Sequence, residues 1–231
     1  MNNQSNYHGH RFPSEIISHA VWLYHRFTLS FRDIEDLLAE RGTIVSYETI
    51  RQWCLKFCPE YAGKLLKRQG RLGDTWFMDE VYVTINGVRH YLWRAVDQDN
   101  NVIDILVQKQ RDKRAAKRFF RKMLKDQGQS PRRMVTDKLK SYGAARKEVM
   151  PSVVHCQDRY ANNRAEASHQ QTRQQERQMR RFKSAGQAQR FLSVHSQVNN
   201  VFRVSRHLLK ACHYRMFRSR AFSIWQEVTC V

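Results

Sequence analysis

An aspartate stands where the strand pattern calls for an apolar side chain. Residues 75–85 (TWFMDEVYVTI) alternate as a β-strand does, and every second residue from Phe77 to Ile85 is apolar except Asp79. A carboxylate on such a face is costly unless its charge is compensated, and a bound cation is a common remedy. The alternative is an ion pair with one of the many arginines. Glu80 points to the opposite face, and we assign it no catalytic role.

Two further acids could complete a metal site with Asp79. Asp137 follows the predicted short strand 133–136, at a strand end where ligands collect in α/β sheets, although an aspartate there can also be a helix N-cap. Glu166 falls in the first turn of a predicted basic helix, 164–181, where it could equally stabilise the helix dipole. Three carboxylates supply the oxygen ligands that hard cations prefer, and two such cations can promote phosphoryl transfer.

The same basic helix carries candidate phosphate contacts. Arg173 and Arg177 follow Glu166 at steps of seven and eleven residues, which places them on its helical face. They could therefore contact a DNA phosphate beside the metal ions. His169, three residues after Glu166, could also lie near this site.

Composition narrows the class of protein. The 231 residues include 41 Lys and Arg against 21 Asp and Glu, a formal net charge of +20, which points first to nucleic acid as partner. A hydrophobic fraction of 41% can fill a core and excludes general disorder. No apolar run reaches the length of a membrane span, and the first residues lack an apolar signal core, so we expect neither a membrane protein nor a secreted one.

Five cysteines without a Cys-x-x-Cys pair favour reduced thiols in a cytosol. We interpret Cys54 and Cys58 as buried thiols rather than metal ligands.

The N-terminal part predicts a helix-turn-helix domain over residues 1–58. Three short amphipathic helices follow one another, and Pro59 should end the third. The outer face of that third helix offers polar side chains that could read base edges in the major groove, although any amphipathic helix has a polar face. These side chains belong to Thr49, Arg51, Gln52 and Lys56. Residues 59–73, basic and with three glycines, are predicted to be a linker.

Residues 74–231 predict an α/β domain with basic C-terminal helices. Asn86-Gly87 is a strong hairpin signal between strands 75–85 and 88–96, and a third strand covers 102–107. A basic amphipathic helix and the strand 133–136 follow. Three antiparallel strands, a helix and a further strand form the opening order of an RNase H-like domain, a mixed sheet flanked by helices. Residues 142–157 look poorly structured.

Four strings carry a resemblance to a known family. They are residues 78–80 (MDE), 136–138 (TDK), 162–166 (NNRAE) and 180–184 (RRFKS). Together they resemble the DDE-type insertion-sequence transposases of the insertion-sequence-six family, from roughly residue 10 onward. The resemblance implies an RNase H-like fold, a catalytic and metal-binding triad of Asp79, Asp137 and Glu166, and a basic residue at Arg173. The interval between Asp137 and Glu166 is shorter than in many DDE enzymes.

The resemblance also implies an activity. Such an enzyme binds the terminal inverted repeats of its element as double-stranded DNA. It uses two Mg²⁺ ions, for which Mn²⁺ can substitute. It cleaves 3′ ends and transfers them into target DNA, with replicative transposition and cointegrate formation. Because two element ends must be held together in one synaptic complex, the enzyme should act as at least a homodimer. It should be located in the bacterial cytoplasm, associated with the nucleoid.

Two other functions remain open. A non-catalytic helix-turn-helix regulator, or an inactive transposase derivative, would bind DNA without chemistry and would not need three carboxylates. An RNase H-like nuclease or resolvase would share the metal site, but its products would be free ends rather than joined strands.

Overall fold

The chain divides into two compact units. The computed structural model describes residues 7–70, 72–157, 162–203 and 209–230. The first unit comprises Met1–Arg68 and Val194–Val231, and the second comprises Gln69–Ser193. The predicted boundaries therefore need correction, because the chain from Val194 onward groups with the N-terminal helices instead of the α/β domain.

The first unit is helical, as the sequence predicts. Its helices are α1 (Ser14–Arg26), α2 (Phe31–Ala39), α3 (Tyr47–Arg68), α8 (Ala211–Thr229) and the end of α7 (Ala185–Phe202). A capping box starts α2: the backbone N–H of Asp33 donates to the Ser30 hydroxyl, and the Asp33 carboxylate accepts from the Ser30 N–H. The α8 helix joins this unit through the ring of Trp225, whose centroid lies 5.5 Å from that of Tyr61 on α3.

Helix α3 continues well past the predicted stop. Pro59 lies inside the helix, which ends only at Arg68. A proline in a helix interior costs about 3 kcal/mol. Tyr61 and Leu65 lie beyond it at helical spacing and are completely or almost completely buried, and burial of each such side chain contributes roughly 1.5–3 kcal/mol. Packing thus outweighs the proline, and most of the predicted linker 59–73 is helical.

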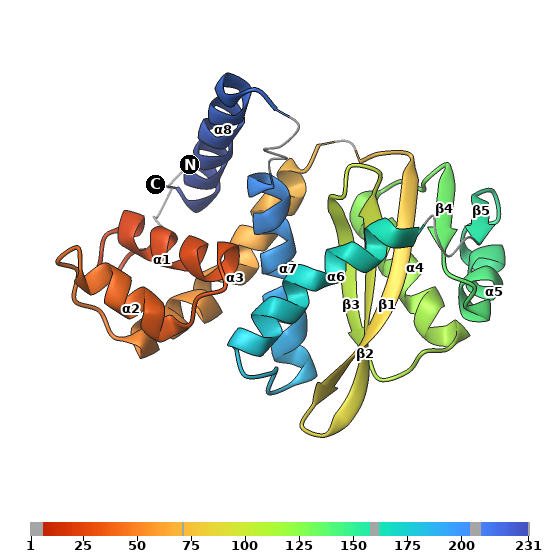
Figure 1. The fold of residues 1–231 in the computed structure, drawn as a ribbon, viewed down its shortest axis with the longest axis horizontal. Coiled ribbons are helices and arrows are strands. Elements are labelled where there is room, and N and C mark those ends of the chain that lie inside the picture. The colour runs from red at the N-terminus through yellow and green to blue at the C-terminus, as the bar shows by residue number, and fades with distance from the viewer. Residues whose placement is uncertain (1–6, 71, 158–161, 204–208, 231) are drawn as a thin grey trace. The chain divides into compact units, whose positions relative to one another are not determined.

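The second unit contains a five-stranded mixed sheet of order β3-β2-β1-β4-β5. The strands are β1 (Thr75–Ile85), β2 (Val88–Asp97), β3 (Val102–Gln108), β4 (Arg133–Thr136) and β5 (Val154–Gln157). The first three pair antiparallel, and β4 and β5 run parallel to β1. Asn86 and Gly87 make the predicted hairpin turn, with φ of 50° and 77°. Figure 1 shows this sheet with its flanking helices. The strand order confirms the RNase H-like fold.

Residues 142–157 are more ordered than the sequence suggests. They contain most of α5 (Lys140–Val149) and all of β5. The side chains of Tyr142 and Ala145 are fully buried, but a short helix followed by a four-residue strand shows too little periodicity to be recognised. The expectation of an irregular segment was therefore wrong.

The main core of this unit lies between the sheet and helices α4 (Lys113–Gln127) and α5. Trp76 and Met78 of β1 belong to it, together with Phe119 and Phe120 of α4. These β1 residues alternate with Asp79, so the aspartate faces the other side of the sheet.

Helix α6 (Asn163–Gln178) packs on β1 and β2, and Figure 1 shows it crossing one face of the sheet while α4 lies behind the strands.

None of the helices in the described ranges is long and apolar enough to cross a membrane.

Candidate active site

Two of the predicted acids lie side by side. Strands β1 and β4 are parallel, and their last registered pair is Met78 with Thr136. Asp79 and Asp137 are the next residues on each strand, and neighbouring strands are about 4.8 Å apart. Asp79 is buried, whereas the Asp137 side chain is 29% exposed. The structure therefore places these two residues at the same level of adjacent strands, one side chain buried and one partly exposed to solvent.

Asp137 also makes a local turn contact. Its Oδ1 accepts a hydrogen bond of 3.0 Å from the backbone N–H of Leu139, just before α5. This contact closes a local Asx-type turn and is not the helix N-cap considered for this aspartate, because the N-cap position of α5 is Leu139. This hydrogen bond involves Oδ1 of Asp137, so Oδ2 takes no part in the turn.

Helix α6 is fixed over Asp79 by buried polar contacts. Asn162, directly before the helix, donates from Nδ2 to the backbone oxygen of Met78 at 2.9 Å. Arg94, the register partner of Asp79 on β2, donates to the backbone oxygen of Ser168 and to the Thr172 hydroxyl. Both donors are almost fully buried. The helix is therefore anchored on both strands beside the aspartate.

His169 is the α6 residue in contact with Asp79. Its Nε2 lies 3.4 Å from Asp79 Oδ2. The pKa of His169 is lowered to about 4, mainly because the imidazole is buried. The nearby Asp79 carboxylate acts in the opposite direction and reverses this shift only in part. The imidazole is therefore neutral at pH 7 and adds no positive charge beside Asp79. The prediction that His169 lies near the site is confirmed.

Glu166 belongs to the same helix, between Asn162 and His169. Its side chain lies outside the part of the chain that the structure describes. The anchored backbone on either side of it places its helix turn over the strand that carries Asp79.

Arg111 lies beside the candidate site although the sequence does not single it out, and it contacts Glu80, to which we assign no catalytic role. Arg111, in the loop before α4, donates from Nε to Glu80 Oε1 at 2.6 Å, and its Nη2 lies 3.7 Å from Asp137 Oδ2. Burial raises the pKa of Glu80 to about 7, and Arg111 counteracts this rise. Glu80 is thus a buried, ion-paired acid whose arginine also reaches Asp137. Arg111 has no local sequence signal, because it is one of 41 basic residues.

The donor set suits a divalent cation. Asp79 and Asp137 offer hard carboxylate oxygens from adjacent strand positions, and the neutral His169 does not cancel their charge. Hard cations such as Mg²⁺ and Mn²⁺ take such oxygens as ligands. The residues present therefore fit a cation held between the two strands.

Comparisons with known proteins decide the family. A family model described as a DDE domain matches residues 73–205. The transposase of the insertion sequence-like element IS431mec of Staphylococcus aureus is 34% identical over 164 residues, covering 69% of this chain and 73% of the relative. The transposase of element IS257 in transposon Tn4003, also from Staphylococcus aureus, is 32% identical with the same coverage. This chain belongs to the insertion-sequence-six family of DDE-type transposases.

Among solved structures, this chain is similar to the HTLV-2 integrase catalytic core domain in complex with magnesium. It has 12% sequence identity and a TM-score of 0.44, and the match covers 60% of this chain and 94% of that one.

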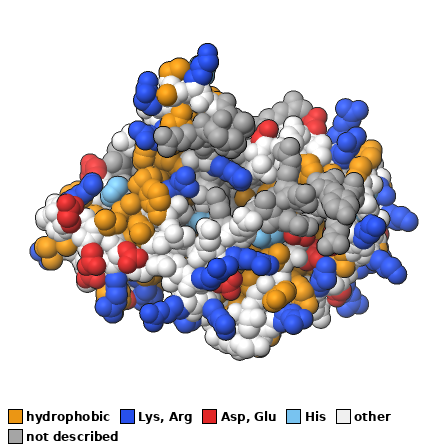
Figure 2. Space-filling model, in the orientation of Figure 1, with side chains coloured by type: hydrophobic (Ala, Val, Ile, Leu, Met, Phe, Trp, Pro, Cys, Tyr) orange, Lys and Arg blue, Asp and Glu red, His pale blue; other side chains and the backbone are white. Residues whose placement is uncertain are grey.

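The transposase carries exposed arginines where α6 ends. Arg173 and Arg177 are both exposed on the helix. Arg177 lines a hollow of roughly 440 Å³ with Glu176, Arg180 and Arg181, whereas Arg173 does not. Figure 2 shows Lys and Arg side chains gathered over this part of the face. Arg180 and Arg181 have φ of 52° and 70°, a conformation uncommon for side-chain-bearing residues.

The candidate base readers of the transposase all lie on α3. Gln52 and Lys56 are exposed, and Thr49 and Arg51 are partly exposed. The Glu48 carboxylate accepts hydrogen bonds of 2.8 Å from Arg51 Nε and from Gln52 Nε2. The same acid therefore orders two of the side chains that could read bases.

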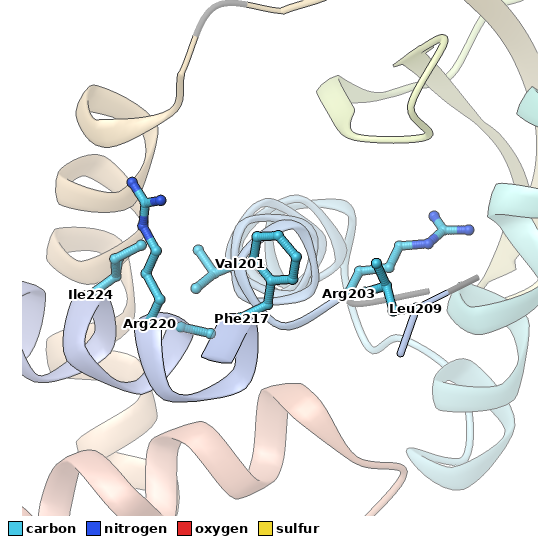
Figure 3. A pocket seen from close by; sticks show the side chains of 7 residues that line it. Val201, Arg203, Leu209, Phe217, Arg220 and Ile224 are labelled. Atoms are coloured by element: carbon cyan, nitrogen blue, oxygen red, sulfur yellow. The ribbon is translucent and has the colours of Figure 1, made fainter. Parts of the chain in front are cut away.

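A second hollow, of roughly 380 Å³, lies in the helical unit. Its lining is mostly apolar and consists of Val201, Arg203, Leu209, Phe217, Arg220, Ala221 and Ile224. Figure 3 shows Val201 and Phe217 in the middle, with Arg220 and Ile224 on one side and Arg203 and Leu209 on the other. None of these described lining residues is an acid or a nucleophile.

Proposed function

We propose that this transposase binds the terminal inverted repeats of its insertion sequence and catalyses metal-dependent 3′-end cleavage and strand transfer into target DNA. The reaction is replicative and yields cointegrates in the bacterial cytoplasm, at the nucleoid. The observation that carries this proposal is the pairing of Asp79 and Asp137 at one level of adjacent parallel strands, with the Glu166 helix anchored over Asp79.

Asp79, Asp137 and Glu166 would hold two Mg²⁺ ions, with Mn²⁺ as a substitute. When bound, the ions activate the attacking oxygen and stabilise the leaving oxygen of an in-line phosphoryl displacement. The protein's own groups keep the carboxylates in place. The neutral His169 can donate its Nε2–H to Asp79 and so orient that carboxylate, and the Arg111 guanidinium attracts the Asp137 carboxylate through an ion-pair contact of 3.7 Å to Oδ2.

The positive charge of the chain serves to hold DNA. Arg173 and Arg177 are placed to contact phosphates of the reacting strand, and Thr49, Arg51, Gln52 and Lys56 to read the inverted repeat. Phosphate contacts make binding strongly dependent on salt concentration. Two ends must meet in one complex, so we expect at least a homodimer during the reaction.

A cointegrate assay in cells tests the proposal. The gene is kept between the ends of its element, and the wild type is compared with Asp79→Asn, which removes one charge with little change of shape. Asp99→Asn, at an exposed position in the β2–β3 turn, is the matched control. We expect cointegrates from the wild type and the control but none from Asp79→Asn, with binding to the element ends retained by all three.

Three results would contradict the proposal. Wild-type transfer by Asp79→Asn would remove the aspartate from the chemistry. Free ends without joined strands would indicate a nuclease. End binding by the wild type without any cleavage would indicate a DNA-binding derivative.

A further inference from the structure

Three potential metal ligands meet inside the helical unit, apart from the acids described above. His25 in the last turn of α1 and Cys54 and Cys58 on α3 are all buried. One ligand atom from each lies within 4.8 Å of the others, and His25 Nε2 is 3.0 Å from Cys58 Sγ. The two thiols are buried, as expected, but the histidine beside them, 29 residues before Cys54, was not foreseen and reopens the role as metal ligands that the sequence analysis set aside.

The secondary structure explains why these groups converge. Cys54 and Cys58 are four residues apart, so both sulfurs lie on the same side of α3. That side packs on α1, because α1 and α3 are neighbours in the helical unit. The last turn of α1 then presents His25 to both sulfurs. The cluster is thus built from two helices that are each fixed by other contacts.

The geometry points to a zinc site, and we propose that His25, Cys54 and Cys58 bind one Zn²⁺ ion that ties α1 to α3. Zinc prefers sulfur and nitrogen ligands at about 2.3 and 2.0–2.1 Å, which in a tetrahedral arrangement separates the ligand atoms by roughly 3.5–3.8 Å. The three atoms already lie within 4.8 Å, and the 3.0 Å contact has to widen by only about half an ångström. Three protein ligands leave one position for water.

This site differs in chemistry from the carboxylate site of the second unit. Thiolates and an imidazole favour zinc, whereas Asp79 and Asp137 offer oxygens that favour magnesium. Because a bound zinc ion would connect the helix of the candidate base readers to α1, its loss should lower the stability of the helical unit. The site can therefore be tested without measuring transposition.

The first experiment measures bound metal in the full-length protein without a histidine tag. Zinc content is determined by elemental analysis in the wild type, Cys54→Ser, Cys58→Ser and His25→Gln. The matched controls are Cys212→Ser and Cys230→Ser, which change exposed thiols, and Asp79→Asn, which weakens the carboxylate site. We expect about one zinc per chain in the wild type and controls, and at least a tenfold lower content in the three ligand variants.

Cobalt substitution identifies the ligands directly. The wild type is stripped with a chelator and titrated with Co²⁺, and the thiolate-to-metal charge-transfer bands are followed in the near ultraviolet. Carboxylate-bound Co²⁺ gives no such bands, so the signal belongs to the cysteine site even if the acids also bind cobalt. We expect saturation at one equivalent, reversal by Zn²⁺, and no bands in Cys58→Ser.

A wild type that stays at background zinc and shows no thiolate bands with Co²⁺ would overturn the proposal. Equal zinc content in the wild type and in a folded Cys54→Ser or Cys58→Ser variant would overturn it as well. If a ligand variant does not fold, the cobalt titration of the wild type decides alone.

Discussion

Arg94 offers a quantitative test of how α6 is held on the sheet. Its guanidinium donates to the Ser168 backbone oxygen and to the Thr172 hydroxyl from a position that is 2% exposed. A hydrogen bond from a charged group contributes about 1.5–3 kcal/mol. Arg94→Lys keeps the charge, but a single ammonium group cannot reproduce the two-pronged geometry. We expect the loss of at least one bond, and hence a free energy of unfolding lower by about 2 kcal/mol.

Urea denaturation followed by tryptophan fluorescence measures this loss, since the neighbouring Trp93 is fully buried in β2. For a chain of this size the same loss corresponds to a melting temperature lower by about 4–8 °C. Arg121→Lys, at an exposed position on α4, is the matched control and should be unchanged. Strand transfer by folded Arg94→Lys should also fall, because Glu166 depends on the position of α6. Stability within about 0.5 kcal/mol of the wild type, with normal transfer, would refute the anchoring role.

Three further predictions concern the second unit. Phe119→Ala empties a fully buried core position and should cost about 3–5 kcal/mol of unfolding free energy in urea. Gly128 ends α4 with φ of 67°, and the space that a Cβ would occupy is open. Gly128→Ala should therefore cost only the strain of the left-handed backbone conformation, about 1–2 kcal/mol of unfolding free energy in the same assay. Hydrogen bonds from Lys113 and Lys117 lower the pKa of Glu148 from 4.5 to about 2. The contribution of ionised Glu148 to stability is therefore complete above pH 4.5 and is lost as the pH falls toward 2. In that interval the melting temperature of Glu148→Gln should depend less on pH than that of the wild type.

The strands and helices with a strong local pattern were predictable from the sequence. Alternation and the Asn86-Gly87 turn define β1 and β2, and α4 follows from its amphipathic period. The continuation of α3 past Pro59 was not predictable, because it depends on buried contacts made by residues further along the helix. The pairing of β4 with β1 likewise depends on a crossover between segments that are far apart in the sequence.

The candidate site was predictable where a residue broke its local pattern, followed a strand end, or lay one helical turn from another candidate. Asp79 is a carboxylate on an apolar strand face, and the structure places it in a buried position beside α6. Arg94 breaks the apolar run of β2 in the same way, so the same reasoning could have identified it. Arg111 has no such signal, because its contacts with Glu80 and Asp137 depend on the path of a loop.

If the proposed active site is right, the segments that carry Asp79, Asp137 and Glu166 converge on one divalent-cation site. Replacing Mg²⁺ by Fe²⁺ and adding ascorbate and peroxide generates radicals at the bound ion, and mass spectrometry then maps the backbone cuts around it. We expect cuts next to residues 79 and 137 and within the first turns of α6, all suppressed by excess Mg²⁺. Cuts at the two aspartates with none in α6, or cuts that Mg²⁺ does not suppress, would contradict the proposed site.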